Sequence, residues 1–303
     1  EMSASLVGSE MCIRDSYNAF KNKDWSVSVG ANATFVKNKI KNLPATMKEN
    51  GYISGSKKWL EGKSIYEFWL RQWHGVDPQT GDGLYVADVS KYNQGNIGTG
   101  DGNITQSQFD EYKKTVVTID GKELTNSYTY AKYDFSGSSI PDVFGGFNVR
   151  VSYKNFDLAA VFSYQLGGQV LDTNYATMMS MTEFGYAQSP DLLKAWKQAG
   201  DITEVPRIDN SAAHTTNIGQ SYSTRWLTSS DYLNLRSVTI GYQFPKAWLS
   251  KVMLKSARLN LTAENLFMLK ARQGLNPMAN YSGVTYNEYM PSRNITLGLN
   301  VSF

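Results

Sequence analysis

The final stretch of the chain, residues 293–303, constrains the possible folds more than any other. Polar and apolar residues alternate without a break, and the apolar positions are Ile295, Leu297, Leu299, Val301 and Phe303. A period of two predicts a β-strand with one apolar and one polar face. Such a strand can cross a bilayer at a tilt, which takes roughly 9–11 residues. An edge strand of a soluble β-sandwich would show the same pattern, so that alternative stays open here.

The same alternation recurs upstream and predicts an all-β, antiparallel protein. Amphipathic strands are expected over 25–35, 147–153, 156–164, 232–244 and 257–263. Only the turn Lys154-Asn155 separates the second of these strands from the third, whereas the long stretch 167–230 follows the third. Short turns alternating with long connections are typical of outer-membrane β-barrels.

The connections between these strands carry weaker patterns. Residues 45–62 are expected to form a loop, and the aromatic-rich segment 64–73 is expected to form a strand. An apolar run at 115–119 followed by the turn pair Asp120-Gly121 predicts a small hairpin. A short helix is expected over 190–198.

Composition excludes several classes of protein. No run of about 18 apolar residues occurs, so a transmembrane helix is not expected, and a mean hydropathy of −0.39 is compatible with alternating strands. Aromatic residues make up 13% of the chain, which suits membrane-interface girdles or a sugar-binding surface. The net charge of +3 comes without a basic run, so nucleic acid is not an expected partner.

Catalytic and metal-binding patterns are weak. His74 and His214 have no metal-ligand spacing, and the chain has no nucleophile elbow or glycine-rich phosphate loop. We therefore expect no enzyme activity and no cofactor.

One segment, 101–105, hints at a calcium loop through Asp101 and Asn103. The EF-hand ligand positions around it hold Ile97, Thr99 and Gln108 instead of acidic residues. An ordinary Asp-Gly turn is therefore the preferred interpretation.

The first residues differ from the rest. Residues 1–16 show no helical or strand period, and they resemble a translated sequencing-adapter artefact that recurs at the ends of metagenomic gene models. We therefore expect a non-native segment over 1–16, which includes the single cysteine, Cys12. No signal peptide is recognisable, which predicts that the true N-terminus of an exported protein lies outside this sequence.

Several segments, in order along the chain, resemble the SusC/RagA-type TonB-dependent transporters, which are large outer-membrane barrels of Bacteroidetes-type bacteria. The most specific are Asp-Tyr-Leu-Asn-Leu-Arg-Ser-Val-Thr-Ile-Gly-Tyr at 231–242 and Ala-Glu-Asn-Leu-Phe at 263–267. The others are 62–66, 73–81, 140–147, 153–158, Val-Pro-Arg at 205–207 and Pro-Ser-Arg at 291–293, with Gly298 and Phe303.

This resemblance implies that residues 17–303 are the C-terminal part of a barrel of about 22 strands. The plug domain, the TonB-binding peptide and the signal peptide would lie outside this sequence. The family imports oligosaccharides or peptides across the outer membrane of Gram-negative bacteria, with a SusD-like surface lipoprotein and TonB as partners. The implied barrel also contacts outer-membrane lipid.

The resemblance further implies that the long connections 88–142, 167–230 and 268–292 face outward around a substrate cavity. Candidate residues for stacking on sugar rings there are Tyr128, Tyr130, Tyr222 and Trp226. Packing of the loops against each other is the preferred interpretation for any single one of them.

The last strand resembles the C-terminal signal that the barrel-assembly machinery reads, with Gly298, Leu299, Val301 and Phe303 as its residues. Two alternatives remain. A secreted sugar-binding β-sandwich would share the alternation and the aromatic residues, but its apolar faces would pack together. A passive porin or adhesin barrel would lack the SusC-like segments.

Overall fold

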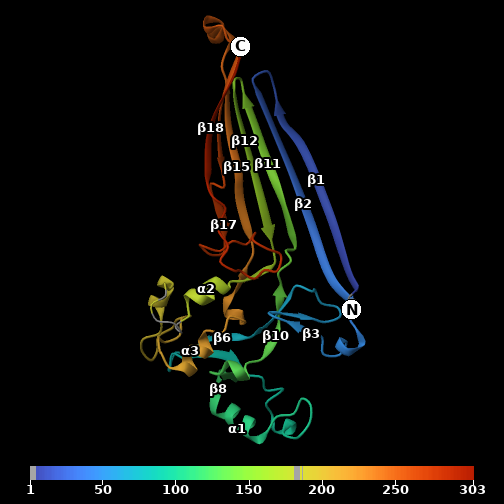
Figure 1. The fold of residues 1–303 in the computed structure, drawn as a ribbon, viewed down its shortest axis with the longest axis vertical. Coiled ribbons are helices and arrows are strands. Elements are labelled where there is room, and N and C mark those ends of the chain that lie inside the picture. Colours follow the sequence, from blue (N-terminus) through green and yellow to red (C-terminus); the bar gives the residue numbers. More distant parts are fainter. Residues whose placement is uncertain (1–4, 181–184, 186) are drawn as a thin grey trace.

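The main feature of the fold is a long, open antiparallel sheet with a layer of loops and short elements at one end (Figure 1). The computed structural model describes residues 5–180, 185 and 187–303. The sheet runs in the order β1 (Ser5–Lys21), β2 (Trp25–Asn42), β11 (Val143–Tyr153), β12 (Phe156–Leu166), β15 (Tyr232–Gln243), β16 (Ser256–Glu264) and β18 (Asn294–Ser302). A short strand, β17 (Met268–Lys270), pairs with the loop end of β15.

The strands predicted from alternation are confirmed in β2, β11, β12, β15, β16 and β18. The hairpin between β11 and β12 turns at Lys154, whose φ of 50° gives the left-handed backbone of a tight turn. Strand β2 continues to Asn42, beyond its apolar pattern, because β1 pairs with it along this length.

Cross-strand pairing collects the apolar side chains on one face of the sheet. One row of directly paired residues runs through Val27, Val151, Leu158, Ile240, Leu261 and Leu297. Ile240, Leu261 and Leu297 are 46%, 41% and 68% exposed. In the described residues no second sheet packs on this face, so the β-sandwich alternative is wrong. The chain is a partial β-barrel whose apolar band faces outward.

An aromatic row borders this band at the end with the short turns. Trp25, Tyr153, Phe156 and Tyr242 are directly paired across four strands. The ring centroids of Trp25 and Tyr153 lie 4.3 Å apart, and those of Phe156 and Tyr242 lie 4.5 Å apart. Aromatic rings at this level are typical of the membrane interface.

The two faces of β18 predict opposite responses to the same substitution. Leu297→Arg places a charge in the apolar band and should destabilise the inserted barrel by about 2–4 kcal/mol. Thr296→Arg, on the polar face, should have little effect. The measurement is the fraction of the barrel protein carrying this strand that inserts into lipid vesicles. Equal insertion of the two variants would show that the faces are assigned wrongly.

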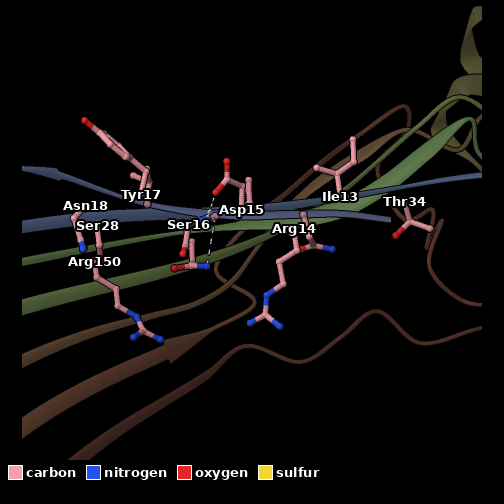
Figure 2. A pocket seen from close by; sticks show the side chains of 14 residues that line it. Ile13, Arg14, Asp15, Ser16, Tyr17, Asn18, Ser28, Thr34 and Arg150 are labelled. Carbon is pink, nitrogen blue, oxygen red and sulfur yellow. Dashed lines mark hydrogen bonds between the residues drawn. The ribbon is translucent and has the colours of Figure 1, made fainter. Parts of the chain in front are cut away.

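Strand β1 is not predicted by the sequence pattern, and it places a charge on the apolar face. Asp15 pairs with Ala31, and Figure 2 shows it on the same side of the strands as Ile13 and Tyr17. Arg14 and Arg150 lie on the opposite side, along a polar hollow of about 710 Å³. A carboxylate facing lipid is unfavourable. This position fits the interpretation of 1–16 as a non-native segment, which stays a prediction.

The connections at the other end of the sheet form a structured layer, called here the loop layer, which consists of the described residues within 43–142, 167–230 and 271–293. Its strands are β3 (Tyr52–Ser54), β4 (Lys57–Trp59), β5 (Glu67–Arg71), β6 (Trp73–Val76), β7 (Gly83–Val86), β8 (Val116–Ile119), β9 (Lys122–Thr125), β10 (Tyr133–Ser138), β13 (Gln169–Leu171) and β14 (Leu227–Ser229). Its helices are η1 (Ala45–Met47), η2 (Gln94–Asn96), α1 (Gln106–Thr115), η3 (Tyr128–Tyr130), α2 (Thr173–Met178), η4 (Pro190–Lys194), α3 (Ala212–Ile218) and η5 (Thr224–Trp226). Helices α4 (Lys246–Leu249) and η6 (Ser250–Val252) lie at the opposite end (Figure 1). Within the described part of the chain, no helix is long and apolar enough to cross a membrane.

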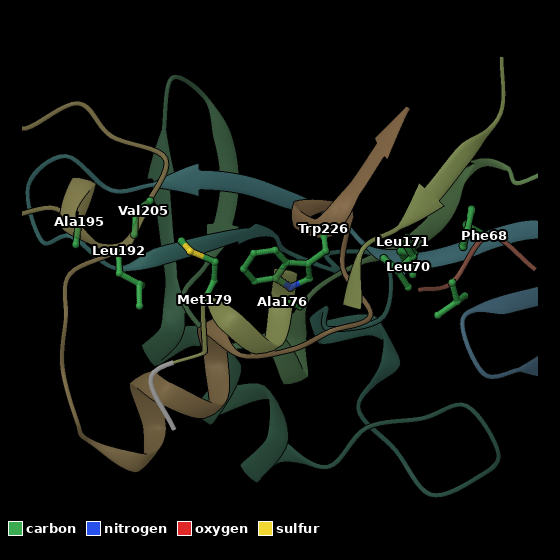
Figure 3. Close-up of a cluster of buried hydrophobic side chains, with 10 residues drawn as sticks. Phe68, Leu70, Leu171, Ala176, Met179, Leu192, Ala195, Val205 and Trp226 are labelled. Atoms are coloured by element: carbon green, nitrogen blue, oxygen red, sulfur yellow. The ribbon is translucent and has the colours of Figure 1, made fainter. Parts of the chain in front are cut away.

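The hydrophobic core lies in the loop layer and not in the sheet. Figure 3 shows its main cluster, which consists of Phe68, Leu70, Leu171, Ala176, Met179, Leu192, Ala195, Val205, Trp226 and Val284. A second cluster around α1 contains Ala87, Tyr92, Ile104, Tyr112 and Tyr130. The main cluster joins segments that are distant in sequence and so ties the long connections together, whereas the second cluster lies within the connection 43–142.

The predictions for the loop layer had mixed outcomes. The hairpin with the Asp120-Gly121 turn is confirmed as β8 and β9. The predicted helix at 190–198 is a shorter 3-10 helix that ends at Lys194, with Ser189 as its N-cap. The expected loop at 45–62 is wrong in part, because it contains β3 and β4, which pair with each other.

Candidate functional site

Two segments that carry the family resemblance meet in the loop layer. In the turn 75–81 the Asp77 carboxylate accepts hydrogen bonds from the Gln79 backbone N–H (2.8 Å) and the Thr80 hydroxyl (2.9 Å). Gly81 ends this turn with a φ of 74°, and its carbonyl accepts a hydrogen bond from the backbone N–H of Arg207 at 2.9 Å. The Val-Pro-Arg segment at 205–207 is therefore held directly against the turn.

Arg207 is the charged centre of this junction. Its guanidinium lies 3.0 Å from an Asp82 oxygen and also pairs with Asp209. Burial lowers the pKa of Arg207, but the two carboxylates outweigh burial and raise that pKa above its ordinary value. The buried His214 ring donates from Nε2 to the Arg207 carbonyl (2.8 Å), with its Nδ1 3.7 Å from Asp82. The Arg207 guanidinium is thus paired within the chain with two carboxylates.

Beside Arg207 lies a cavity of about 590 Å³. It is lined by Asp82, Thr115, Asn126, Ser127, Tyr128, Arg207, Ser211, Ala212, Ala213, His214, Thr216 and Asn217. Hydroxyl and amide groups next to one aromatic ring suit a ligand that offers many hydrogen bonds, such as a sugar or a peptide segment. We take this cavity as the candidate functional site.

Tyr128, one of the predicted candidates, lines this cavity. Its backbone N–H donates to the Asn217 side chain at 2.6 Å, and its carbonyl accepts from Arg71 Nε at 2.9 Å. The Arg71 guanidinium also lies 4.8 Å from the centre of the Tyr128 ring. The backbone N–H of Arg71 donates to the carbonyl of Tyr222, whose side chain is 38% exposed. The structure thus brings Tyr128 and Tyr222 to the same arginine.

The other two candidates are buried. Trp226 is 2% exposed in the main cluster, where its Nε1 donates to the Gln220 carbonyl at 2.8 Å. Tyr130 is 8% exposed in the second cluster, with Tyr92 at 4.9 Å between ring centroids. Neither ring has a face free for a sugar in this structure, which agrees with the packing interpretation.

Arg225 is a partly buried charge that the sequence did not single out. Its guanidinium lies between the rings of Trp73 (4.7 Å) and Trp226 (4.3 Å) and donates to the Ile218 carbonyl (3.0 Å). Burial lowers the pKa of Arg225 to about 10. No spacing rule in the sequence indicates this arrangement, because Trp73 lies far from it along the chain.

Hydrogen bonds within the chain hold the end of the predicted calcium loop, where helix α1 begins. Thr105 caps α1, and its backbone N–H donates to the Gln108 side chain at 2.8 Å, which completes a capping box. Gln108 occupies the EF-hand position of the bidentate glutamate, so this side chain is already engaged. In the described residues no group of three or more His, Cys, Asp or Glu side chains gathers to hold a metal ion. Calcium at Asp101 and Asn103 stays a prediction.

The proposed assembly signal lies on the apolar face of β18. Leu299, Val301 and Phe303 are 62%, 38% and 80% exposed, whereas Gly298 pairs with Asn260 on the polar face. Recognition of these residues by the barrel-assembly machinery stays a prediction.

Lys57 gives the loop layer a predicted pH dependence. Its amino group donates to the Tyr66 carbonyl (2.9 Å) and lies 3.1 Å from the centre of the Phe68 ring. Burial lowers the pKa of Lys57 to about 7, from 10.5 in the unfolded chain. Between these values the unfolded chain binds the extra proton, so loop-layer stability should rise as the pH increases from 7 toward 10 and be lowest below 7.

The measurement is the protease half-life of the loop layer between pH 6 and 9. Lys57→Met should remove the contribution of this group and flatten the profile. An unchanged slope in that variant would assign the pH dependence to other groups.

The chain is similar in sequence to proteins that are already classified. TonB-dependent receptor P3 of Formosa agariphila is 26% identical over 93% of this chain and 27% of its own length. TonB-dependent receptor P39 of the same organism is 24% identical over 96% of this chain and 31% of its own length. This similarity runs along nearly the whole chain and supports its assignment as part of a barrel like those of TonB-dependent receptors. The chain spans about three tenths of the length of these relatives.

The fold of a solved transporter agrees with this assignment. The structure described as the RagAB peptide transporter superposes with a TM-score of 0.75 at 21% identity, over 99% of this chain and 30% of that chain. No family model matches the sequence of this chain.

Proposed function

We propose that this chain forms part of the wall and outer loops of a barrel that imports a nutrient across the outer membrane of a Bacteroidetes-type bacterium. The observation that carries the proposal is the outward apolar band crossed by β2, β11, β12, β15, β16 and β18. A continuous exposed apolar band is unfavourable in water but favourable in contact with lipid. Energy for import would come from TonB, acting on a plug domain of the complete protein. No catalytic step is assigned to the chain.

The substrate is proposed to be an oligosaccharide or a peptide that contacts the loop layer. The cavity beside Tyr128 and Arg207 supports this, because hydroxyl and amide groups and the Tyr128 ring line it next to the paired charges of Arg207 and Asp82. A peptide is favoured by the likeness to a peptide transporter, and a sugar by the hydroxyl-rich lining. Tyr222, exposed next to the same arginine, would extend this surface.

Three protein partners are proposed. A SusD-like surface lipoprotein would cap the loop layer from outside, and the likeness to the RagAB pair supports this class of partner. TonB would act through a part of the protein outside this sequence. The barrel-assembly machinery would read Gly298, Leu299, Val301 and Phe303 in β18.

The gene that contains this segment provides the first test. Long-read sequencing across its 5′ end should reveal an upstream plug domain and signal peptide, and a SusD-like gene nearby. A frame that truly begins near residue 1, without a plug or a partner gene, would overturn the transporter proposal.

The complete transporter provides the second test. Uptake of labelled oligosaccharides and peptides should depend on TonB, and Tyr128→Ala should reduce uptake of the true substrate. Val117→Ala, a change at a partly exposed hairpin residue that does not line the cavity, is the matched control.

A further inference from the structure

The apolar face of the sheet is not uniform, because a groove of about 580 Å³ lies at its loop end. Leu166, Leu233 and Leu269 line it together with the rings of Phe147 and Tyr164. This volume lies within the range of roughly 300–1,000 Å³ in which proteins hold small ligands. The groove therefore has the size of a binding site.

Strand pairing shows that the groove opens on the membrane-facing side. Tyr164 pairs with Leu233, and Leu233 pairs with Leu269, so the three side chains share one face. Tyr164 also pairs with Gly145, which pairs with Ala33 of the apolar face of β2. Leu166 and Leu269 are 51% and 61% exposed. The groove is thus continuous with the apolar band that contacts lipid.

Four of the polar side chains that line the groove, those of Tyr164, Ser229, Asp231 and Lys270, already make hydrogen bonds within the chain. The bonds are Tyr164 hydroxyl to Asn32 carbonyl (3.2 Å), Gly167 N–H to Asp231 carboxylate (2.7 Å), Asp231 N–H to Ser229 hydroxyl (3.0 Å) and Lys270 amino group to Leu275 carbonyl (2.7 Å). A sugar or peptide in the groove would lose hydrogen bonds to water and find few partners in return. A hydrocarbon chain would lose none.

We propose that this groove binds one acyl chain of lipid A from the outer leaflet of the membrane. The leaflet follows from the proposed function, in which the loop layer faces outward. The leucines supply the apolar floor, and the rings of Phe147 and Tyr164 form one wall. A lipid held here would fix the height of the loop layer above the membrane. Ser229 belongs to both the groove and the loop layer, and Asp231 in the groove accepts a hydrogen bond from Gly167 of that layer.

The test uses the complete transporter purified in detergent from membranes that contain lipopolysaccharide. Retained lipid A per protein is measured by mass spectrometry. Leu269→Trp fills the groove and should lower retention about tenfold, because excluding even two methylene groups from an apolar contact has an effect of this size. Leu297→Trp, on the same apolar face but outside the groove, is the matched control and should retain lipid A like the parent.

Three further measurements keep the proposal falsifiable. Heat-dependent gel mobility tests whether each variant is folded. Leu166→Trp fills the groove from the side of β12 and should lower lipid A retention in the same way. Equal retention by the parent and both groove variants would overturn the proposal, as would retention of phospholipid in place of lipid A. Substrate uptake is measured on the same variants, so a failure of the transport proposal is seen separately.

Discussion

Replacing Trp226 by alanine should unfold the loop layer while the long sheet stays assembled. The side chain is 2% exposed, and its ring lies edge-on to Tyr175 with 5.9 Å between ring centroids. Truncation of a buried tryptophan costs roughly 3–5 kcal/mol. It also removes the shorter of two hydrogen bonds that the Gln220 carbonyl accepts, the other coming from the Ser223 hydroxyl. No residue of the long strands belongs to this cluster among the described residues, so the damage should stay in the loop layer.

Two readouts separate the layer from the barrel. The protease half-life of the loop layer in the complete transporter should fall sharply, while heat-dependent gel mobility of the barrel should stay unchanged. Tyr222→Ala is the matched control, because it removes a large ring that is 38% exposed and lies outside the cluster. If both variants show the same half-life, then the cluster around Trp226 is not what holds the loop layer together.

Gly81→Ala should be nearly as damaging, for a different reason. Gly81 has a φ of 74°, a backbone that costs a residue with a Cβ about 1–2 kcal/mol. A Cβ at this position would also lie 2.4 Å from the Trp196 ring and 2.9 Å from Arg207 Cβ. Such overpacking adds roughly 1–3 kcal/mol. The turn at 75–81 and the Val-Pro-Arg segment should separate, and the cavity beside Arg207 should lose its shape.

Gly102→Ala distinguishes these two costs. Gly102 has a similar φ of 87°, but a Cβ there would meet nothing within 4 Å. Gly102→Ala should therefore lose only the free energy that the left-handed backbone costs. The difference in unfolding free energy between the two variants then measures the steric contact at Gly81. Both are compared by thermal unfolding of the loop layer and by substrate uptake. Equal destabilisation would mean that the contact of Gly81 with Trp196 and Arg207 is not formed in solution.

Local alternation was sufficient to predict the long sheet. An outward apolar face repeats every second residue, so strands such as β12 and β18 can be recognised one at a time. The order β2, β11, β12, β15, β16, β18 follows the chain, which the short turn at Lys154 already indicated for one pair. Strand β1 could not be predicted because its alternation is broken by Asp15 on the apolar face.

The loop layer was much less predictable, because its contacts join segments far apart in sequence. Nothing near Trp226 in sequence shows that it packs beside Leu70 and Leu171. Helix α1 could have been found from Thr105 and Gln108, whose spacing is that of a capping box.

Of the four aromatic residues predicted as candidates for contact with substrate, Tyr128 lines the candidate cavity. The resemblance at 205–207 pointed to a segment of interest, but only the structure places Arg207 beside Asp82 and the cavity. His214 has no metal-ligand spacing in the sequence, and its actual partner is a backbone carbonyl, which sequence patterns do not reveal.

The loop layer and the long sheet are stabilised by different sets of residues, which has an evolutionary consequence. The clusters that stabilise the loop layer contain no residue of the long strands in the described chain, and the sheet is stabilised by its own pairing and by lipid. A substitution in one part therefore carries little penalty in the other. The loops can therefore change, even by exchange of whole segments between genes, while the long sheet varies independently under the constraint of its own pairing and its apolar face.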